Sequence, residues 1–338
     1  MTVGGTIVTV GGGVQLLQLP DIDFTFLVDN TTGATSRKQK NSDVDDYGGA
    51  FSAGIETPVG HWGATPITGV VSGFFANVTD SQNRGCASSA SETCFAEDIV
   101  DSPGGDSFGF GSLTARTHRD VYFWGVNGEL RFGKRPAPLP DSGGYLFRFG
   151  YVGIGADVRG IDQDNRITIR SSDAFATDID YSETLDTTYS GGFLSIGGEY
   201  NVLGYLGIGG SLGLRSFLTL KGGIYNASTD YSGRFQTEGA FGPDRDTRLN
   251  LSNDKTAFIG GASFETRKQF GARTSLSLLT DYEWFSYAPK MKYLDADPPA
   301  EGIVDATNIS DSEAFAVRTQ LRLNIGLGTQ ALYAEPMK

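Results

Sequence analysis

The sequence predicts an all-β fold, a closed up-and-down antiparallel transmembrane β-barrel of about ten strands, and three observations support this. Gly accounts for 47 of the 338 residues and aromatic side chains for 12%, which disfavours helices and favours strands. Segments of alternating apolar and polar residues recur along the chain. The polar segments between them are alternately short and long, as are the turns and loops of membrane-spanning barrels. No run of eighteen apolar residues occurs, so no transmembrane helix is expected.

Ten segments carry the alternating pattern. In chain order they are 7–28, 47–57, 67–78, 121–132, 145–160, 191–202, 205–225, 256–270, 273–287 and 314–327. The first is expected to break at Pro20, and Leu203-Gly204 is expected to form a tight turn. The apolar phase shifts near Tyr151, which predicts a β-bulge. The long polar segment 79–120 has room for an extra hairpin, which would give twelve strands and a wider barrel.

Charged side chains recur in mid-strand on one face only. In 121–132, Trp124, Val126 and Leu130 share one face, and Glu129 and Arg131 lie on the other. If the apolar face meets lipid, the charged face lines the lumen. The predicted lumen-lining residues are Asn127, Glu129, Arg131, Arg148, Glu199, Arg215, Glu265, Arg267, Asp281, Glu283, Arg318 and Arg322. Both signs of charge in a narrow ten-strand lumen favour a salt-bridged filling, whereas a twelve-strand barrel would favour a pore.

The two cysteines, Cys86 and Cys94, are eight positions apart in a polar segment, which predicts a disulfide and an oxidising compartment. Two free thiols are the alternative, and no metal site is expected because neither His is nearby.

The first five residues show neither the basic nor the apolar region of a signal peptide. The net charge of -13 argues against binding to nucleic acid phosphates.

The chain resembles the Gram-negative outer-membrane β-barrel superfamily, in the manner of a porin or small barrel, across roughly 7–327. The Gly-rich alternating segments 191–202 (GGFLSIGGEYNV) and 206–214 (LGIGGSLGL) carry this resemblance, and no single family within it is assigned. It implies one barrel domain over 1–338, with short periplasmic turns, long acidic outer loops and a C-terminal tail at 328–338. It also implies location in the outer membrane, with the lipid bilayer and lipopolysaccharide as partners. One departure is the end of the last strand, because Leu327 is followed by a tail in which Tyr333 is the only aromatic residue.

Catalysis is the alternative that the sequence leaves open. Omptin-like outer-membrane proteases are similar in having ten strands, and they use Asp and His at the outer mouth. His118 precedes Arg119 and Asp120 at the start of a strand, and His118 and Asp120 would share a face. The alternative without catalysis is that His118 is a solvent-exposed loop residue. Neither a G-x-S-x-G nor an H-E-x-x-H motif occurs.

The remaining motifs are weak. His61-Trp62 in a short turn is best explained by an interfacial Trp anchor. The stretch 162–165 (DQDN) only partly matches a calcium loop, since it lacks the Gly and the distant Glu. The acidic run around Asp295, with Glu301 and Asp305, would hold divalent cations loosely.

The sequence therefore favours an outer-membrane barrel with a structural or surface-interaction role, or one that passes small solutes by diffusion. The runner-up is a hydrolase, an omptin-like protease or a lipid-modifying enzyme, with its site at the extracellular mouth. A third possibility is a scaffold whose outer loops or periplasmic turns bind another protein. No cofactor is expected.

Overall fold

The barrel strands are long and strictly antiparallel. The computed structural model describes residues 5–22, 24–32, 35–39, 45–96, 108–133, 147–171, 178–200, 214–238, 245–271, 273–293 and 307–327. Ten strands close into one barrel in the order β1-β14-β13-β12-β11-β10-β9-β8-β5-β4, and β4 pairs with β1 to complete the ring. The prediction of a closed barrel of about ten strands is confirmed.

The strand bounds are close to the predicted ones at one end of the barrel and far beyond them at the other. The barrel strands are β1 (Thr6–Gln18), β4 (Asp45–Trp62), β5 (Thr65–Ala87), β8 (Ser112–Gly133), β9 (Phe147–Ser171), β10 (Asp178–Tyr200), β11 (Leu214–Glu238), β12 (Arg245–Gln269), β13 (Thr274–Lys292) and β14 (Asn308–Leu327). A separate sheet, in the order β3-β2-β6-β7, consists of β2 (Thr25–Asp29), β3 (Thr35–Gln39), β6 (Glu92–Ala96) and β7 (Phe108–Phe110).

The segment in which an extra barrel hairpin was considered does form strands. However, β6 and β7 pair with the small sheet and not with the barrel wall. The predicted break at Pro20 is present, since β1 ends at Gln18 and β2 begins at Thr25.

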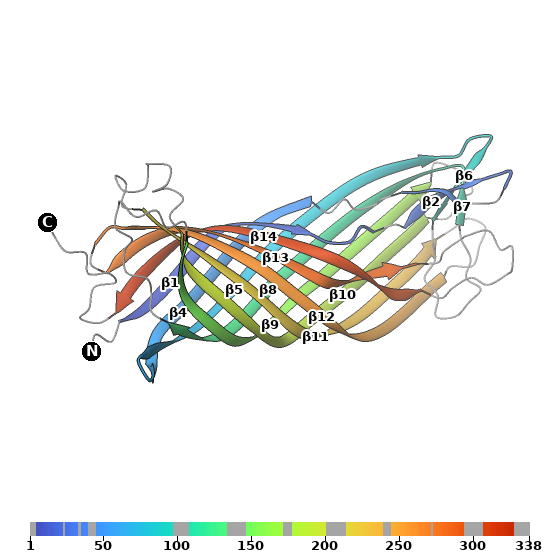
Figure 1. The fold of residues 1–338 in the computed structure, drawn as a ribbon. Coiled ribbons are helices and arrows are strands. Elements are labelled where there is room, and N and C mark those ends of the chain that lie inside the picture. The colour runs from blue at the N-terminus through green and yellow to red at the C-terminus, as the bar shows by residue number, and fades with distance from the viewer. Residues whose placement is uncertain are drawn as a thin grey trace.

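Two ends of the barrel are distinguished by their connections (Figure 1). The start of β1, the end of β14 and the β4–β5 turn lie at one end, and the small sheet lies at the other. We call these the turn end and the loop end. In the β4–β5 turn Gly63 has φ +59°, a conformation that favours glycine. Among the described residues, no helix is long and apolar enough to cross a bilayer.

Most of two polar stretches predicted as long outer loops is strand. Residues 161–171 and 178–190 continue β9 and β10 without interruption, and β11 and β12 extend in the same way. The cause is a change of apolar phase along each strand. In β9 Val152 and Ile154 are exposed on the outer face, whereas Ile161, Ile167 and Ile169 are buried inside. The barrel wall therefore has a second half, the outer extension, with its apolar face turned inward.

One irregularity in the wall lies close to the turn end. The β9–β10 pairing skips Gly150, with Tyr151 opposite Gly197 and Phe149 opposite Gly198, so the predicted bulge is confirmed. The predicted tight turn at 203–204 lies outside the described residues.

Candidate functional site: the lumen, its plug and the outer wall

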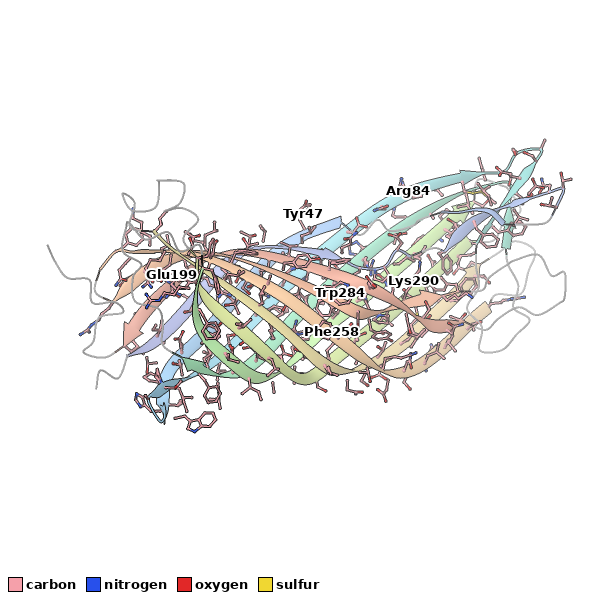
Figure 2. All side chains as sticks on the ribbon, viewed as in Figure 1. Tyr47, Arg84, Glu199, Phe258, Trp284 and Lys290 are labelled. Atoms are coloured by element: carbon pink, nitrogen blue, oxygen red, sulfur yellow. A yellow bond between two sulfur atoms is a disulfide. The ribbon has the colours of Figure 1, made fainter. Side chains whose placement is uncertain are left out.

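An apolar belt encircles the turn-end half of the barrel. Exposed side chains of this lipid-facing belt are Val14, Phe51, Phe75, Val126, Ile154, Leu194, Ile224, Phe258, Leu278 and Leu321. Figure 2 shows Tyr47, at the outer limit of the belt on β4, projecting from the outer surface. A closed barrel pairs the backbone groups of its wall, which lipid requires, and the belt supplies the apolar surface. These features are those of a transmembrane β-barrel.

Inside the belt lies a polar cavity of about 240 Å³. The structure places nine of the twelve predicted lumen residues on its wall, namely Asn127, Glu129, Arg131, Glu265, Arg267, Asp281, Glu283, Arg318 and Arg322. The wall carries five carboxylates and five cations, the remaining members being Glu56 and Lys221.

One ion-pair group crosses the lumen between distant strands. Arg159 on β9 pairs with its neighbour Asp157 and, at 2.8 Å, with Glu283 on β13. Lys221 on β11 donates to Asp157 at 2.6 Å and lies 3.7 Å from the ring centroid of Phe193. Asp157 and Arg159 are each less than 5% exposed. These side chains span the width of the lumen and tie its walls together.

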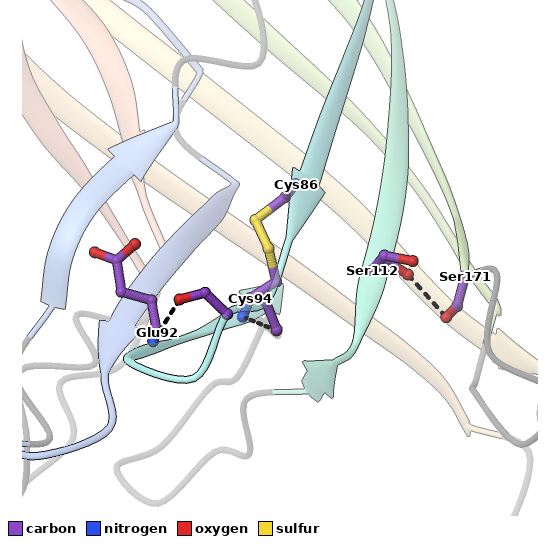
Figure 3. The surroundings of a disulfide bond; sticks show 7 residues. Cys86, Glu92, Cys94, Ser112 and Ser171 are labelled. Carbon is purple, nitrogen blue, oxygen red and sulfur yellow. Dashed lines mark hydrogen bonds between the residues drawn. A yellow bond between two sulfur atoms is a disulfide. The ribbon is translucent and has the colours of Figure 1, made fainter.

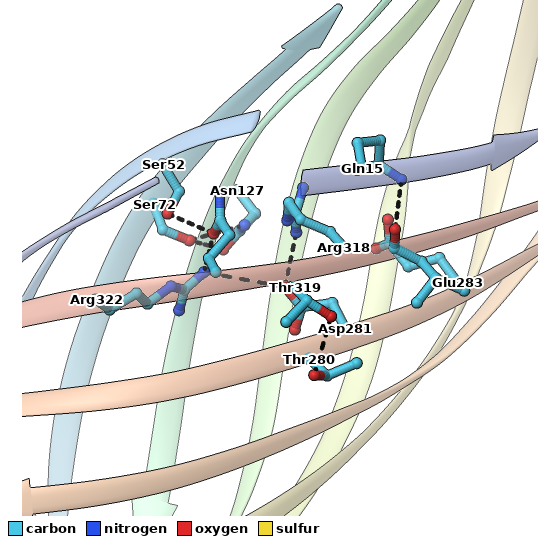
Figure 4. Close-up of polar contacts among 12 residues, drawn as sticks. Gln15, Ser52, Ser72, Asn127, Thr280, Asp281, Glu283, Arg318, Thr319 and Arg322 are labelled. Atoms are coloured by element: carbon cyan, nitrogen blue, oxygen red, sulfur yellow. Dashed lines mark hydrogen bonds and ion pairs between the residues drawn. The ribbon is translucent and has the colours of Figure 1, made fainter. Parts of the chain in front are cut away.

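A second group lies along β13 and β14 (Figure 4). Arg318 donates to Asp281 at 2.9 Å and stacks 3.9 Å above the Phe74 ring centroid. Arg322 lies 3.9 Å from the same carboxylate. Elsewhere on the cavity wall, two strand-neighbour pairs join Arg267 to Glu265 at 2.7 Å and Arg131 to Glu129 at 2.8 Å.

The other three predicted lumen residues lie nearer the turn end. Figure 2 shows the position of Glu199 toward the turn end. Glu199 is buried and accepts from Arg215 at 2.8 Å. Arg148 lies opposite Glu199 in the β9–β10 register and is exposed. These residues are not on the cavity wall.

Sequence analysis missed Asp157, Arg159 and Lys221 as lumen residues. The signal was present for the first two, because they alternate with the lipid-facing Val158. The bulge at Gly150 shifts the phase and hid this relation.

Above the cavity, toward the loop end, an aromatic layer fills the barrel. Phe123, Tyr189, Tyr225 and Phe285 are almost completely buried, and they belong to four different wall strands. The ring centroids of Phe285 lie 5.9 Å from Phe123 and 5.4 Å from Tyr189. The Tyr189 hydroxyl donates to the Tyr287 carbonyl at 3.0 Å. The wall itself therefore closes the lumen at this level.

The outer extension holds a second apolar core, into which the β1–β2 connection folds. The described residues of this connection, 19–22 and 24, which we call the plug segment, place Phe24 inside the barrel with no exposed surface. The Phe24 ring stacks on Tyr181 at 4.8 Å and meets Tyr293 edge-on at 5.1 Å. Arg119 anchors the segment by donating to the Pro20 carbonyl at 3.2 Å.

A buried carboxyl group lies beside the plug segment. Glu183 accepts hydrogen bonds from Asn165 at 2.8 Å, from Tyr293 at 2.9 Å and from Tyr181. Burial raises the pKa of Glu183, and the hydrogen bonds and the charge of Arg119 offset only part of that effect. The side chain thus favours its protonated form more than an exposed glutamate does.

The disulfide ties the small sheet to the barrel (Figure 3). Cys86, near the end of β5, is bonded to Cys94 on β6, with 6.1 Å between their Cα atoms. Both are buried, and the Ser88 hydroxyl accepts from the Cys94 amide at 2.8 Å. The bond shortens the connection between the wall and β6.

His118 lies on the outside of the barrel wall, not at the mouth as the hydrolase hypothesis required. Its neighbours Thr117 and Arg119 are buried inside, so His118 and Asp120 face outward by strand alternation. His118 Nε2 lies 3.1 Å from Asp120 Oδ2, and His118 Nδ1 lies 2.7 Å from the Ser81 hydroxyl. Sequence analysis missed Ser81, because only the β5–β8 register brings it to His118.

The remaining candidates do not form a metal site. Asp162 faces outward and accepts from the Trp124 indole at 3.0 Å, whereas Gln163 and Asn165 are buried inside. These side chains diverge, so the partial calcium-loop match is not a binding loop. Within the described ranges, no three His, Cys, Asp or Glu residues are arranged to hold a metal ion. The acidic run around Asp295 lies outside the described residues.

The predicted membrane anchor in the β4–β5 turn has the expected exposure. Trp62 is 75% exposed and contacts Phe132 edge-on at 6.1 Å. This position suits an interfacial aromatic.

No protein-family model and no curated protein matches the chain. Among solved structures it is similar to the outer membrane protease OmpT from Escherichia coli, at 10% identity and a TM-score of 0.46, over 96% of this chain and 97% of that one. It is also similar to the translocator domain of autotransporter NalP from Neisseria meningitidis, at 12% identity and a TM-score of 0.34, over 97% of this chain and 90% of that one. A FadL homologue from Pseudomonas aeruginosa is similar at 8% identity and a TM-score of 0.26, over 95% of this chain and 90% of that one. No activity follows from likenesses at this level.

Proposed function

We propose that the protein is a surface-interaction scaffold of the outer membrane and not a diffusion channel. The observation that carries the proposal is the filling of the lumen by side chains of its own wall. Phe123, Tyr189, Tyr225 and Phe285 come from barrel strands, so the closure at this level is made by the wall itself. The crossed ion pairs of Arg159 add a second closure below this layer.

The outer extension supports the scaffold role. Residues 161–171 of β9 rise roughly 28 Å above the belt, taking about 3.3 Å per residue and a strand tilt of about 40°. The extension has its own apolar core, and within it strands β5 and β8 to β12 pair as one continuous sheet, which holds the tip at a fixed height. A barrel that only passes solutes does not require an outer extension of this length.

The tip itself supplies the surface that a partner would contact. The turn after β2 is ordered by Asp29, whose carboxylate accepts from the Thr31 and Thr32 amides at 2.8 Å. The Asn30 amide donates to the Ser91 carbonyl at 2.8 Å, which joins this turn to the segment before β6. The disulfide then fixes β6 to the wall. A macromolecule at the cell surface would meet this preformed edge.

We further propose that lipid surrounds the belt and that lipopolysaccharide surrounds the lower outer extension. The aromatic side chains Phe75 and Tyr122, 6.1 Å apart between ring centroids, mark the level where apolar chains would give way to headgroups.

Two measurements test the scaffold proposal. Purified protein in planar bilayers should show no steady conductance, and replacement of residues 19–24 by a Gly-Ser linker should leave it silent. Ohmic openings of the unmodified protein would overturn the proposal.

The second measurement uses a photoreactive residue at Thr32 in the tip and, as a matched control, at Ser228 on the outer wall. Both positions are exposed or half-buried and polar. Crosslinks to one defined cell-surface macromolecule from Thr32 but not from Ser228 would support the scaffold role. Equal, diffuse labelling from both would remove the tip as the contact surface.

A further inference from the structure

Four polar side chains form a continuous hydrogen-bonded chain on the outer wall, above the belt. The Thr79 hydroxyl donates to Asp120 Oδ1 at 2.6 Å, and Asp120 Oδ2 accepts from His118 Nε2 at 3.1 Å. His118 Nδ1 in turn lies 2.7 Å from the Ser81 hydroxyl. We propose that Ser81, His118 and Asp120 are a nucleophile, a general base and its positioning carboxylate. Their substrate would be a carboxylic ester of an anionic amphiphile at the membrane surface.

The β5–β8 register builds this arrangement. Thr79 faces Asp120 and Ser81 faces His118 as consecutive cross-strand pairs on the same face. Directly opposed strand residues have Cβ atoms about 5 Å apart, which is the spacing that a hydroxyl–imidazole bond needs. The four side chains come from two strands whose pairing continues beyond the site as far as Ala87 and Ser112, so their backbones are held side by side.

The hydrogen bonds assign the roles. A serine hydroxyl becomes a nucleophile when a neighbouring base accepts its proton, and the base is oriented by a third group on its other nitrogen. With Asp120 accepting at Nε2, the free electron pair of neutral His118 lies on Nδ1, which faces Ser81. Thr79 occupies the other carboxylate oxygen, so Asp120 has one orientation available.

Two arginines flank the arrangement. Arg166 lies opposite His118 on β9, and Arg116 lies two positions above His118, diagonal to Ser81. Both side chains are exposed, and within the described part of the chain neither takes part in an ion pair. Arg166 and His118 border an open hollow of about 470 Å³ on the wall. Guanidinium groups at this place would bind a phosphate or carboxylate of the substrate and stabilise the oxyanion.

The height of the site above the belt indicates the substrate. His118 is four positions beyond Tyr122 along β8, or roughly 10 Å higher for about 3.3 Å per residue and a tilt of about 40°. This is the headgroup layer and not bulk water. An amphiphile anchored in the outer leaflet would cover the exposed triad and exclude solvent from it.

The reaction balances without a cofactor. The Ser81 oxygen bonds to the ester carbonyl carbon as its proton moves to His118 Nδ1. The carbon–alkoxide bond then breaks, and the alcohol leaves with that proton. Water then adds to the acyl carbon as one of its protons moves to His118 Nδ1. The bond between that carbon and the Ser81 oxygen breaks, the proton returns to Ser81, and the product acid leaves and ionises in water.

The first test is covalent labelling. Folded protein in detergent is treated with a fluorophosphonate, and the modified residue is mapped by mass spectrometry. We expect a single label, on Ser81, and we expect Ser81→Ala and His118→Ala to abolish it. The control is Ser182→Ala, which should keep the label, because Ser182 is an exposed serine of the same hollow that has no histidine contact. Absence of label on Ser81 in protein shown to be folded by its heat-modifiable electrophoretic mobility would overturn the proposal.

The second test separates catalysis from structure. Hydrolysis of p-nitrophenyl hemisuccinate, an anionic ester, should exceed that of the neutral butyrate, and Arg116→Gln with Arg166→Gln should abolish the preference. Ser81→Ala should lower the rate about 100-fold. Thr79→Val should lower kcat and shift the pH profile, and Thr79→Ser should restore both. Equal rates in all variants would show that the site is inert.

Discussion

The two halves of the barrel have opposite interiors. In the membrane half the outer face is apolar and the interior carries crossed ion pairs such as Arg159 with Glu283. In the outer extension the outer face is polar and the interior holds Ile167, Phe235 and Tyr181, all almost fully buried. The medium outside each half explains the difference. Lipid accepts apolar side chains and leaves charges for the lumen, whereas water requires an ordinary apolar core.

A single continuous strand therefore turns its apolar side chains outward in the membrane half and inward in the outer extension. On β10, Leu194 and Ile196 face out into lipid, and Tyr181, Leu185 and Tyr189 face in. The apolar phase changes while the backbone pairing with β9 and β11 continues. An apolar-phase change without a gap in pairing is thus a mark of where a barrel leaves the membrane.

The membrane half is most easily broken through its charges. Arg159→Ala would remove the ion pair of Glu283 and leave the buried Asp157 with Lys221 alone, and it should lower the free energy of unfolding by about 3–5 kcal/mol. Urea unfolding in detergent, followed by tryptophan fluorescence, measures it. The matched control Arg166→Ala, at an exposed position, should change it by less than about 0.5 kcal/mol. A loss as small as the control's would mean that the lumen is flooded and its ion pairs are screened.

The outer extension is most easily broken through its apolar core. Phe24→Ala should cost about 3 kcal/mol, the lower end for a buried Phe because the plug segment has room to settle. The control Phe258→Ala, on the lipid face, should cost less. Conductance should stay absent in both variants, because the aromatic layer remains. A pore in Phe24→Ala would place the closure in the plug and not in the wall.

The disulfide should matter only to the tip. For a closed loop of this size, the loss of chain entropy in the unfolded state gives a stabilisation of about 2.5 kcal/mol by the disulfide. We expect Cys86→Ser with Cys94→Ser to increase proteolysis near β6 and to leave the unfolding of the barrel unchanged. A shift of the whole unfolding transition would indicate that tip and barrel fold as one unit.

The smallest effect concerns pH. Because burial raises the pKa of Glu183, this group stabilises the fold below the ordinary glutamate pKa, and the contribution is lost as pH rises through the folded-state value. Glu183→Gln should therefore flatten the decline in stability from acid to neutral pH, with Asn165 and Tyr293 still within bonding distance. Unfolding midpoints over that range check it, and an unchanged pH slope would contradict the assignment.

The strand number and the disulfide partners were predictable because both depend on local pattern. The wall of β8, with Trp124 and Val126 outside and Glu129 and Arg131 inside, follows from a period of two. The outer extension was not predicted, since its outward residues are polar and a polar run suggests a loop. The Ser81–His118 contact depends on register between strands separated by a long connection, which no local pattern fixes.

The inverted interiors are tested most directly by a spin-label scan along β9. The described part of the chain has no free cysteine, so single cysteines can be introduced from 152 to 170 with the native disulfide intact. In lipid bilayers, labels at 154 and 158 should be accessible to oxygen and shielded from a water-soluble nickel chelate. Labels at 164 and 168 should show the reverse, and labels at 167 and 169 should be immobile and accessible to neither. Oxygen accessibility that continues unchanged past 160 would contradict the account.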